Sequence, residues 1–422
     1  MNYESFNMGV YNLHIIHTNK FKTVTVEVDF RRKVNKDEIT SRNLLKSILL
    51  YSTREYSDER SLIKQTENLY DLKLISSNIR IGNYTNLSFK IKFLNEKYTE
   101  KNMNKESINF LLDVLFNPDV KDNSFNEEYL NKCKNKLKRS IKSLKDNKLK
   151  YTLFKLLETA KDKPYSYNSY GYLEDLDKIN GKNLYKYYKS IIESDKIDVF
   201  IVGDVDSLEI KEIFKEHFKT NTYKRIVNDI EVAELEINKK VSFYEEKDEV
   251  NQTQLTILCN LKDITEFERK YVSLVYNEML GGSSSSLLFD TVREKNSYAY
   301  YINSNIKVYD NILMIYSGIE NGNEKEVYRL INKVLDGIKK GKFSNENLEN
   351  AKSTIIASIN ASKDNPSGII NTYFAKELVG AKDFEERIEN INKVTELDIK
   401  NIAKKVHIHT VYTLKGENNE ED

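Results

Sequence analysis

Apolar residues recur at helical spacing in two segments of the chain. The two stripes are Leu130, Cys133, Leu137 and Ile141, then Leu348, Ala351, Ile355 and Ile359. Spacings of three and four residues are typical of one face of an amphipathic helix. Each stripe follows a Phe, and the two Phe residues, Phe125 and Phe343, are 218 positions apart (343 − 125 = 218). The pattern therefore predicts two equivalent helices.

A second pair of segments matches downstream, at an offset of 215 residues. The matching positions are Leu173, Leu176, Lys178, Ile179 and Leu184, then Ile388, Ile391, Lys393, Val394 and Ile399. Each segment leads into a β-rich run, at 197–202 and 410–414 respectively. Two matches in the same order at nearly the same offset indicate an internal duplication. Coincidental helix patterning is the alternative.

Each half also contains two predicted strands before its long helices. The predicted strands are 73–81 and 87–93 in the first half, and 298–308 and 312–317 in the second. Gly82-Asn83 between the strands of the first pair and Asp310-Asn311 between those of the second favour tight turns. Ser57 and Ser344 are the predicted N-caps of following helices.

Strands followed by helices predict an α+β fold. We expect two homologous halves, each a mixed or antiparallel sheet with helices packed on one face. The predicted organisation is an N-terminal domain over 1–218, a polar linker over 219–240 and a C-terminal domain over 241–422.

Composition changes this picture little. Of the 422 residues, 39% are apolar and 31% are charged, the net charge is +1, and no apolar run approaches the length of a membrane span. We therefore expect neither a nucleic-acid partner nor a membrane. The absence of a basic start followed by an apolar stretch indicates no secretory signal. With only Cys133 and Cys259, the chain suits a reducing compartment, so we expect the cytoplasm.

One segment is strongly basic, although the net charge of the whole chain is close to zero. Lys132 to Lys150 contains nine Lys or Arg residues and one Asp. Contact with RNA is one interpretation. A solvated helix face or a partner surface is the simpler one.

Several motifs resemble the insulinase/pitrilysin family of zinc peptidases. The segment from Met279 to Tyr300 reads Met-Leu-Gly-Gly-Ser-Ser-Ser-Ser-Leu-Leu-Phe-Asp-Thr-Val-Arg-Glu-Lys-Asn-Ser-Tyr-Ala-Tyr. It is similar to that family's Gly-Gly-x-Ser turn, helix, Arg-Glu-Lys and strand-opening Tyr. The first half is similar through Leu49-Leu-Tyr-Ser-Thr-Arg, Phe116-Asn-Pro and Gly203-Asp-Val-Asp. The resemblance covers nearly the whole chain and implies that the two halves form a clamshell.

The zinc motif of active members is missing. In that family, H-x-x-E-H supplies two His ligands and a general base, and a Glu on a later helix is the third ligand. At the matching positions this chain has Asn43 and Ser47 in place of the histidines and Lys46 in place of the Glu. None of the five His residues belongs to an H-E-x-x-H or H-x-x-E-H motif. The resemblance therefore implies no metal, no cofactor and no catalytic residue of this chain's own.

Arg293 and Tyr300 match the family's substrate-binding Arg and Tyr, which hold the substrate carbonyl and stabilise the oxyanion. A residual structural role is the alternative.

The resemblance therefore implies a catalytically silent subunit that binds peptide or protein and complements a zinc-bearing homologous chain. It is similar to the zinc-less members of bacterial pairs linked to modification of translation elongation factor P. A chaperone-like or scaffold clamshell that binds peptides without proteolysis is the second hypothesis. A stand-alone metallopeptidase with unusual ligands is the third.

Overall fold

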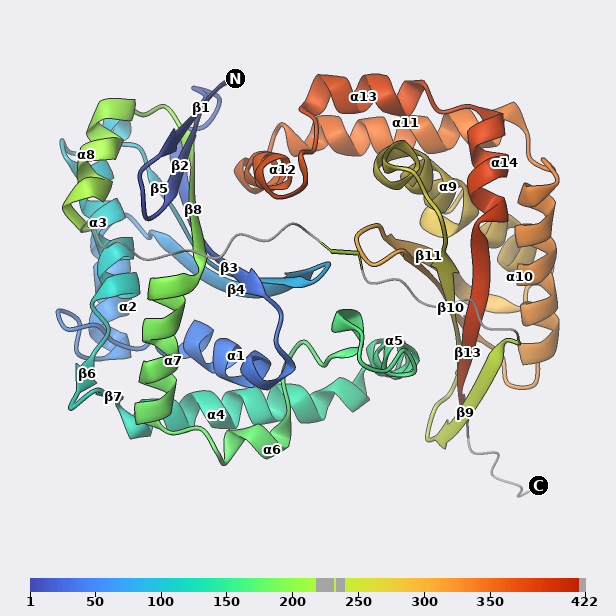
Figure 1. Ribbon diagram of the computed structural model, residues 1–422, viewed down its shortest axis with the longest axis horizontal. Coiled ribbons are helices and arrows are strands. Elements are labelled where there is room, and N and C mark those ends of the chain that lie inside the picture. Colours follow the sequence, from blue (N-terminus) through green and yellow to red (C-terminus); the bar gives the residue numbers. More distant parts are fainter. Residues whose placement is uncertain (218–230, 233–239, 417–422) are drawn as a thin grey trace. The chain divides into compact units, whose positions relative to one another are not determined.

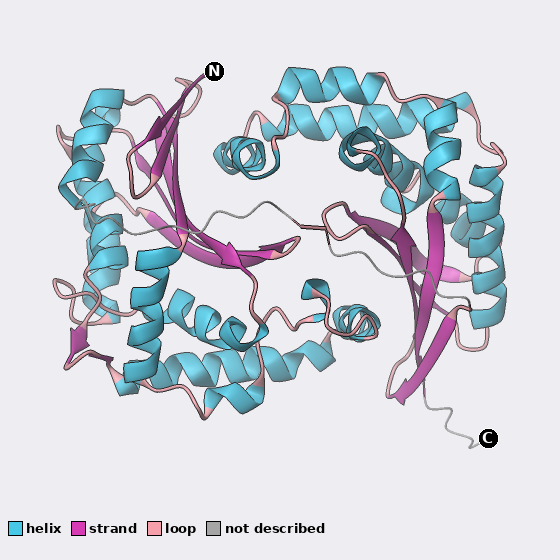
Figure 2. Ribbon diagram, in the orientation of Figure 1, coloured by secondary structure: helices cyan, strands magenta, loops and turns pink. Residues whose placement is uncertain are grey.

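The computed structural model describes residues 1–217, 231–232 and 240–416, and these residues form two compact units. Unit 1 gathers the described residues of Met1–Lys142, Asn168–Asp229 and Asn365–Phe374; unit 2 gathers those of Ser143–Tyr167, Ile230–Asp364 and Ala375–Asp422. Each unit contains one large sheet and several helices (Figures 1 and 2). The predicted linker, 219–240, lies almost entirely outside the described residues.

The two sheets share one strand order. The first sheet contains β1 (Asn2–Asn7), β2 (Asn12–His17), β8 (Lys196–Gly203), β3 (Thr23–Lys33), β5 (Tyr84–Leu94) and β4 (Lys73–Ile81), in that order. The second contains β9 (Ser242–Asp248), β13 (Val406–Gly416), β10 (Thr253–Leu261), β12 (Ile312–Ile319) and β11 (Ala299–Lys307). In each sheet one pair is parallel, β2 with β8 and β9 with β13, and the other pairs are antiparallel. Apart from β1, every strand of one sheet has a counterpart in the other, which confirms two homologous halves.

The helices also follow one order in the two halves. The first half contains η1 (Lys36–Glu38), α1 (Ile39–Ile48), α2 (Glu59–Asn68), η2 (Glu96–Tyr98), α3 (Met103–Phe116), the small hairpin β6 (Val120–Lys121) and β7 (Ser124–Phe125), α4 (Glu127–Lys142), η3 (Ser143–Asp146), α5 (Lys148–Glu158), η4 (Pro164–Ser166), α6 (Leu173–Leu176), α7 (Gly181–Ser194) and α8 (Ser207–His217). The second contains η5 (Glu268–Val272), α9 (Ser273–Asn277), η6 (Glu278–Gly282), η7 (Phe289–Glu294), α10 (Glu324–Lys339), α11 (Asn345–Ser362), α12 (Pro366–Val379), α13 (Phe384–Asn392) and α14 (Glu396–Lys404). The first residues of α4 and α11 are 218 apart (345 − 127), and so are those of α5 and α12 (366 − 148).

One predicted helix cap is confirmed and one is wrong by a residue. Ser344 caps α11, and its side chain accepts a hydrogen bond from the Asn347 N–H. The N-cap of α2 is Asp58 rather than Ser57. The Asp58 carboxylate accepts from the Ser61 N–H at 2.7 Å, and the Ser61 hydroxyl accepts from the Asp58 N–H. This reciprocal capping box favours Asp58, because Ser57 has no such partner three residues into the helix.

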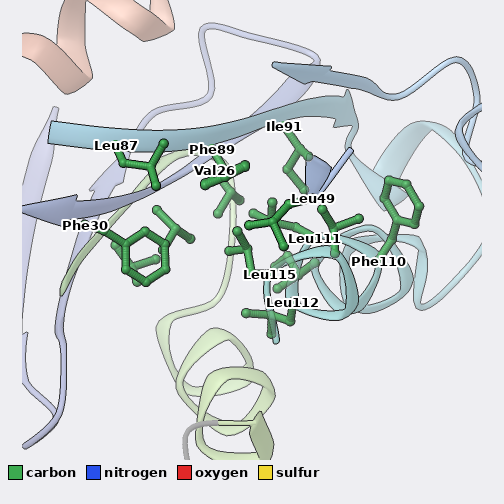
Figure 3. Close-up of a cluster of buried hydrophobic side chains, with 14 of the residues drawn as sticks. Val26, Phe30, Leu49, Leu87, Phe89, Ile91, Phe110, Leu111, Leu112 and Leu115 are labelled. Carbon is green, nitrogen blue, oxygen red and sulfur yellow. The ribbon is translucent and has the colours of Figure 1, made fainter. Parts of the chain in front are cut away.

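The core of unit 1 lies between one face of its sheet and the helices α1 and α3 (Figure 3). Val24, Val26, Val28 and Phe30 alternate along β3 and are at most 1% exposed. They pack with Phe89 of β5 and with a set of α3 side chains that includes Leu111, Leu112 and Leu115. The period of two on β3 and the helical period on α3 therefore bury one face of each element.

The two halves of the chain exchange a helix. α5 follows α4 in the first half, yet it belongs to unit 2, where Leu156 packs with Leu258, Met314 and Tyr412. The first residues of α12 come from the second half, yet they belong to unit 1. In each case the helix after the long amphipathic helix covers the sheet built by the other half of the sequence.

Candidate functional site

The positions that match the family's zinc motif lie on α1, and the side chains of Asn43 and Ser47 bond to the backbone. Asn43 is buried, and its amide donates to the carbonyls of Ile39, at 3.0 Å, and Ser169, at 2.8 Å. The Ser47 hydroxyl donates to the Asn43 carbonyl at 3.3 Å. Both groups thus stabilise the local fold of α1.

The same corner of unit 1 is electropositive. Lys46 is half-buried on α1, which packs against α4. Burial lowers the pKa of Lys46, and the nearby charge of Lys136 on α4 lowers it further. Burial raises the pKa of Cys133 on α4 to about 12, so this thiol stays protonated at neutral pH. Ammonium groups, an amide and a protonated thiol do not fit Zn²⁺, which needs deprotonated donors.

No other part of the described chain supplies a metal site. Within residues 1–217, 231–232 and 240–416, no three His, Cys, Asp or Glu side chains are grouped so that they could hold a metal ion. His14 and His17 both lie on β2, and His14 bonds to a buried carboxylate that is described below.

In unit 2, a glycine turn positions the second candidate site. Gly281, the penultimate residue of η6, has a non-helical backbone and lies against β11. A Cβ added to Gly281 would lie 2.8 Å from the Ser304 nitrogen, so no larger residue fits without displacing the strand. The serines after the glycines form a turn into the next helix, in which the Ser286 N–H donates to the Ser283 carbonyl at 3.2 Å. This geometry agrees with a helix-leading turn and involves no histidine that could activate a serine.

Arg293 and Tyr300 are joined by a tight helix–strand corner. Ser297 adopts a left-handed backbone with φ of 55°. Its N–H donates to the Arg293 carbonyl at 2.9 Å, and the Tyr298 N–H donates to the Val292 carbonyl at 3.1 Å. This pair of bonds resembles a Schellman cap, widened by one residue because the helix is π-helical. The corner therefore fixes where η7 ends and β11 begins.

Both side chains of this pair are exposed. The Arg293 guanidinium lies 4.8 Å from the centre of the Phe289 ring, one helical turn earlier. Tyr300, the second residue of β11, is 55% exposed. A cationic donor held by an aromatic ring and a phenol on a strand can both bind an anionic or carbonyl oxygen.

Sequence reasoning missed a buried polar row in unit 1. On β3, Thr25, Glu27, Asp29 and Arg31 alternate with the apolar core residues, a pattern that predicts a solvent-exposed face. All four are at most 7% exposed. The start of α12 covers this row: the Arg31 guanidinium lies 5.7 Å from the Phe374 ring centre, and Lys90 donates to the Ser367 hydroxyl. No local signal could have shown this, because α12 lies in the other half of the sequence.

Asp29 of this row faces Asp198 of the neighbouring strand β8, and the pKa values of the two carboxylates shift in opposite directions. Asp198 accepts from Asn12 at 2.8 Å and from Arg31 at 3.2 Å, and its other bonded neighbour, the His14 ring, is 3.4 Å away. Burial alone would raise the pKa of Asp198, but these bonds and the charges of Lys196 and Arg31 lower it.

Asp29 pairs with Asp198 in the strand register and has the opposite shift. Burial raises its pKa well above the usual range, and the neighbouring charge of Glu27 raises it further. Its Oδ1 accepts from the Asn86 amide at 2.6 Å, while its Oδ2 is buried without a hydrogen-bond partner among the described residues. One carboxylate is therefore charged and paired, and its neighbour favours the protonated form.

Comparison with known proteins gives consistent results. The family model described as "Peptidase M16 inactive domain" matches residues 178–355. "Probable inactive metalloprotease YmfF" from Bacillus subtilis (strain 168) is 30% identical over 413 residues, 97% of this chain and 96% of YmfF. "Uncharacterized zinc protease YmxG" from the same organism is 26% identical over 359 residues, 82% of this chain and 84% of YmxG.

A solved structure matches the whole chain. The crystal structure of a conserved protein from Enterococcus faecalis V583 has a TM-score of 0.91 and 26% identity, and the match covers 100% of both chains. The α+β fold with two sheet-containing halves and the resemblance drawn from the sequence are therefore confirmed. In the part of the chain that the structure describes, no helix is both long and apolar enough to cross a membrane.

Proposed function

Because this chain belongs to the peptidase M16 family and its α1 has lost that family's zinc ligands, we propose that it is a non-catalytic subunit that complements a zinc-bearing homologue. The matching family model and YmfF are both described as inactive, in agreement with the loss of the zinc motif, so the chain is a peptidase-like protein without catalytic zinc chemistry of its own. The partner is proposed to be a chain of the same family that keeps the metal motif.

The observation that carries the proposal is the contrast between two corners. On α1, Asn43 and Ser47 now bond to backbone carbonyls, and Lys46 brings a positive charge. On η7 and β11, Arg293 and Tyr300 remain exposed at a corner that is closed by hydrogen bonds. An exposed Arg–Tyr pair adds nothing to a core, which supports a role outside this chain's own stability.

The chemistry proposed for the pair is stabilisation of charge on a partner's substrate. A zinc-bound hydroxide that attacks a peptide carbonyl builds negative charge on the carbonyl oxygen. The Arg293 guanidinium and the Tyr300 hydroxyl would donate hydrogen bonds to that oxygen. Loss of one such donor typically costs about 10²–10³ in turnover.

The test is to co-express this chain with a zinc-bearing M16 homologue from the same genome and to measure hydrolysis of a quenched peptide library. We expect Arg293→Ala and Tyr300→Phe to lower turnover strongly while the complex still forms. Arg60→Ala and Tyr244→Phe are matched controls, because both residues are exposed and lie outside the corner. If both corner variants support hydrolysis as well as wild type does, the pair is structural and the proposal fails.

One observation favours a second candidate, a peptide-binding scaffold without proteolysis. β4 is an edge strand of the first sheet, and Ile75 and Ile79 on it are 58% and 49% exposed. Ile75 and Ile79 are four residues apart on one strand and therefore lie on the same face. As an edge strand of this sheet, β4 also has one side along which no other described strand pairs with its backbone. An extended peptide could add to it as a further strand. Peptide binding by the purified chain, with no hydrolysis alongside any homologue, would favour this candidate.

A further inference from the structure

A groove of about 540 Å³ in unit 2 has a strongly basic lining. It lies between η7 and α10, which pack against each other. The cationic residues that line it are Lys295, Arg329, Lys333, Lys340 and Lys342, and Asp336 is its one acidic lining residue. These residues come from two separate stretches of sequence, 287–296 and 329–342, so the fold adds Lys295 to the charges of the second stretch.

Only part of this charge is neutralised by the protein. Lys295 pairs with Asp290 at 2.7 Å, and Arg329 pairs with Glu326. Lys333, Lys340 and Lys342 pair with no acid among the described residues. The groove therefore keeps an excess of positive charge that an acidic ligand would neutralise.

The floor of the groove is apolar. Leu287 is half-buried, and Leu330 and Val334 are 3% and 9% exposed. No charged side chain of the lining is buried, so the groove lacks the fixed polar groups that orient a small molecule in a dedicated pocket. Flexible ammonium groups around an apolar floor fit a peptide that carries both acidic and apolar side chains.

A second groove shows that lysines alone do not produce this character. It has about 470 Å³, lies along α4 and α6 in unit 1, and includes Lys134, Lys138 and Lys142. Glu174 and Asp177 line it as well and offset most of that charge. Its three lysines belong to the basic run of the sequence. Because it has a similar volume and three lysines of its own, it is a matched control for the groove in unit 2.

We propose that the groove between η7 and α10 docks an acidic, amphipathic segment of a partner protein. This proposal does not depend on proteolysis, on Arg293 or on Tyr300. It names an interaction surface and the chemistry of its partner. Because the attraction is largely between exposed charges, binding should weaken as salt screens them.

The test measures binding of a fluorescein-labelled peptide, with Glu and Leu at helical spacing, to the full-length chain by fluorescence anisotropy. We expect salt-sensitive binding that weakens by at least about tenfold in the triple variant Lys333→Glu, Lys340→Glu, Lys342→Glu. The control variant Lys134→Glu, Lys138→Glu, Lys142→Glu should bind within about twofold of wild type. If the first triple variant fails to fold by circular dichroism, the same three Lys→Gln substitutions replace it.

Three further probes test the apolar floor and the class of partner. A Glu-only peptide of equal length should bind more weakly than the Glu/Leu peptide. Polyuridylate and inorganic pyrophosphate should bind wild type no better than they bind the groove variant. Absence of peptide binding, equal losses in the two triple variants, or tighter binding of RNA or pyrophosphate at this groove would each overturn the proposal.

Discussion

The two sheets share a strand order, but the faces that receive the exchanged helices differ in chemistry. In unit 1 the start of α12 covers buried charged groups, among them Arg31 and Asp198. In unit 2, α5 covers an apolar cluster that contains Leu258 and Met314. The duplication thus preserved the backbone frame while the side chains on one face diverged. The strand order is constrained by strand pairing and by the connections between strands. The side chains on one face of the sheet are constrained only by the helix that covers them.

The difference should give the two units different sensitivities. A buried charge network depends on every partner, because removal of one leaves another uncompensated in a region of low dielectric. An apolar contact depends instead on volume and buried area. The stability of unit 1 should therefore depend on pH and on changes of charge, whereas the stability of unit 2 should depend on the size of its buried side chains.

The largest expected effect is in the charged face. Asp198→Ala would leave Arg31 buried without its carboxylate and should destabilise unit 1 by about 3–5 kcal/mol. Because the chain has no Trp, urea unfolding is followed by circular dichroism, and hydrogen exchange shows which unit opens. Asp204→Ala, at the residue that follows the same strand and pairs with Lys97 near the surface, should cost no more than about 1 kcal/mol. Equal losses of unfolding free energy in the two variants would show that the buried charge network contributes no more to stability than a surface ion pair does.

The apolar face should be sensitive to volume. Leu156→Ala removes a fully buried side chain of α5 and should cost about 2–5 kcal/mol, with faster hydrogen exchange in β10 and β13. The cost should not vary with pH, because no charge changes. Leu208→Ala, at a position that is 72% exposed, is the control and should be nearly neutral. A strong pH dependence of the Leu156 effect would contradict the comparison.

Asp29 should make the stability of unit 1 fall as pH rises. Its pKa is raised in the folded state, so the native chain binds the proton more tightly than the unfolded chain does. The stability linked to this group is complete below the unfolded pKa, about 3.9, and is lost as pH rises toward the folded pKa. Asp29→Asn keeps a neutral side chain at every pH. Between the unfolded and the folded pKa of Asp29, we expect the free energy of unfolding of this variant to rise relative to that of wild type by up to about 1.4 kcal/mol per pH unit.

Unfolding by urea between pH 5 and pH 9 measures this gain. A constant difference between the two proteins would show that Asp29 does not change its protonation on folding.

The smallest expected effect concerns the start of α5. The Tyr151 hydroxyl donates to Glu246 on β9 at 2.8 Å, and Lys148 pairs with Asp248 at 2.9 Å. Tyr151→Phe should cost about 0.5–1.5 kcal/mol, the usual net value of one hydrogen bond. Thermal unfolding measures it, with Tyr98→Phe at an exposed position as the control. A cost as large as that of Leu156→Ala would mean that polar contacts, rather than the apolar cluster, hold α5.

The sequence predicted features that depend on local periodicity. The strand pairs at 73–94 and 299–319 and the paired helices that begin at Glu127 and Asn345 lie where the patterns place them. The absence of zinc ligands also follows directly from residue identity at 43, 46 and 47. The exchange of α5 and α12 could not be predicted, because periodicity shows that a helix has an apolar face but not which sheet that face meets.

The same reason explains what sequence reasoning missed in the candidate sites. The alternation of Glu27 and Asp29 with apolar neighbours has the form of a solvated strand, and only the distant α12 buries it. The basic run from Lys132 to Lys150 reads as one surface, yet α4 and α5 place its parts in different units. In the basic groove, Lys295 is distant in sequence from the cationic residues of 329–342, and it joins them only when η7 packs on α10.

The exchanged helices also bear on how such a chain could have arisen. A single half, made alone, would have a sheet with one face uncovered and a helix with no surface of its own to pack on. Two copies could satisfy both needs only by trading helices, as in a domain-swapped dimer. An ancestor with one half would therefore have been an obligate homodimer. Tandem fusion of its gene would have placed both copies in one polypeptide. The two copies could then acquire different residues where each exchanged helix packs on its sheet.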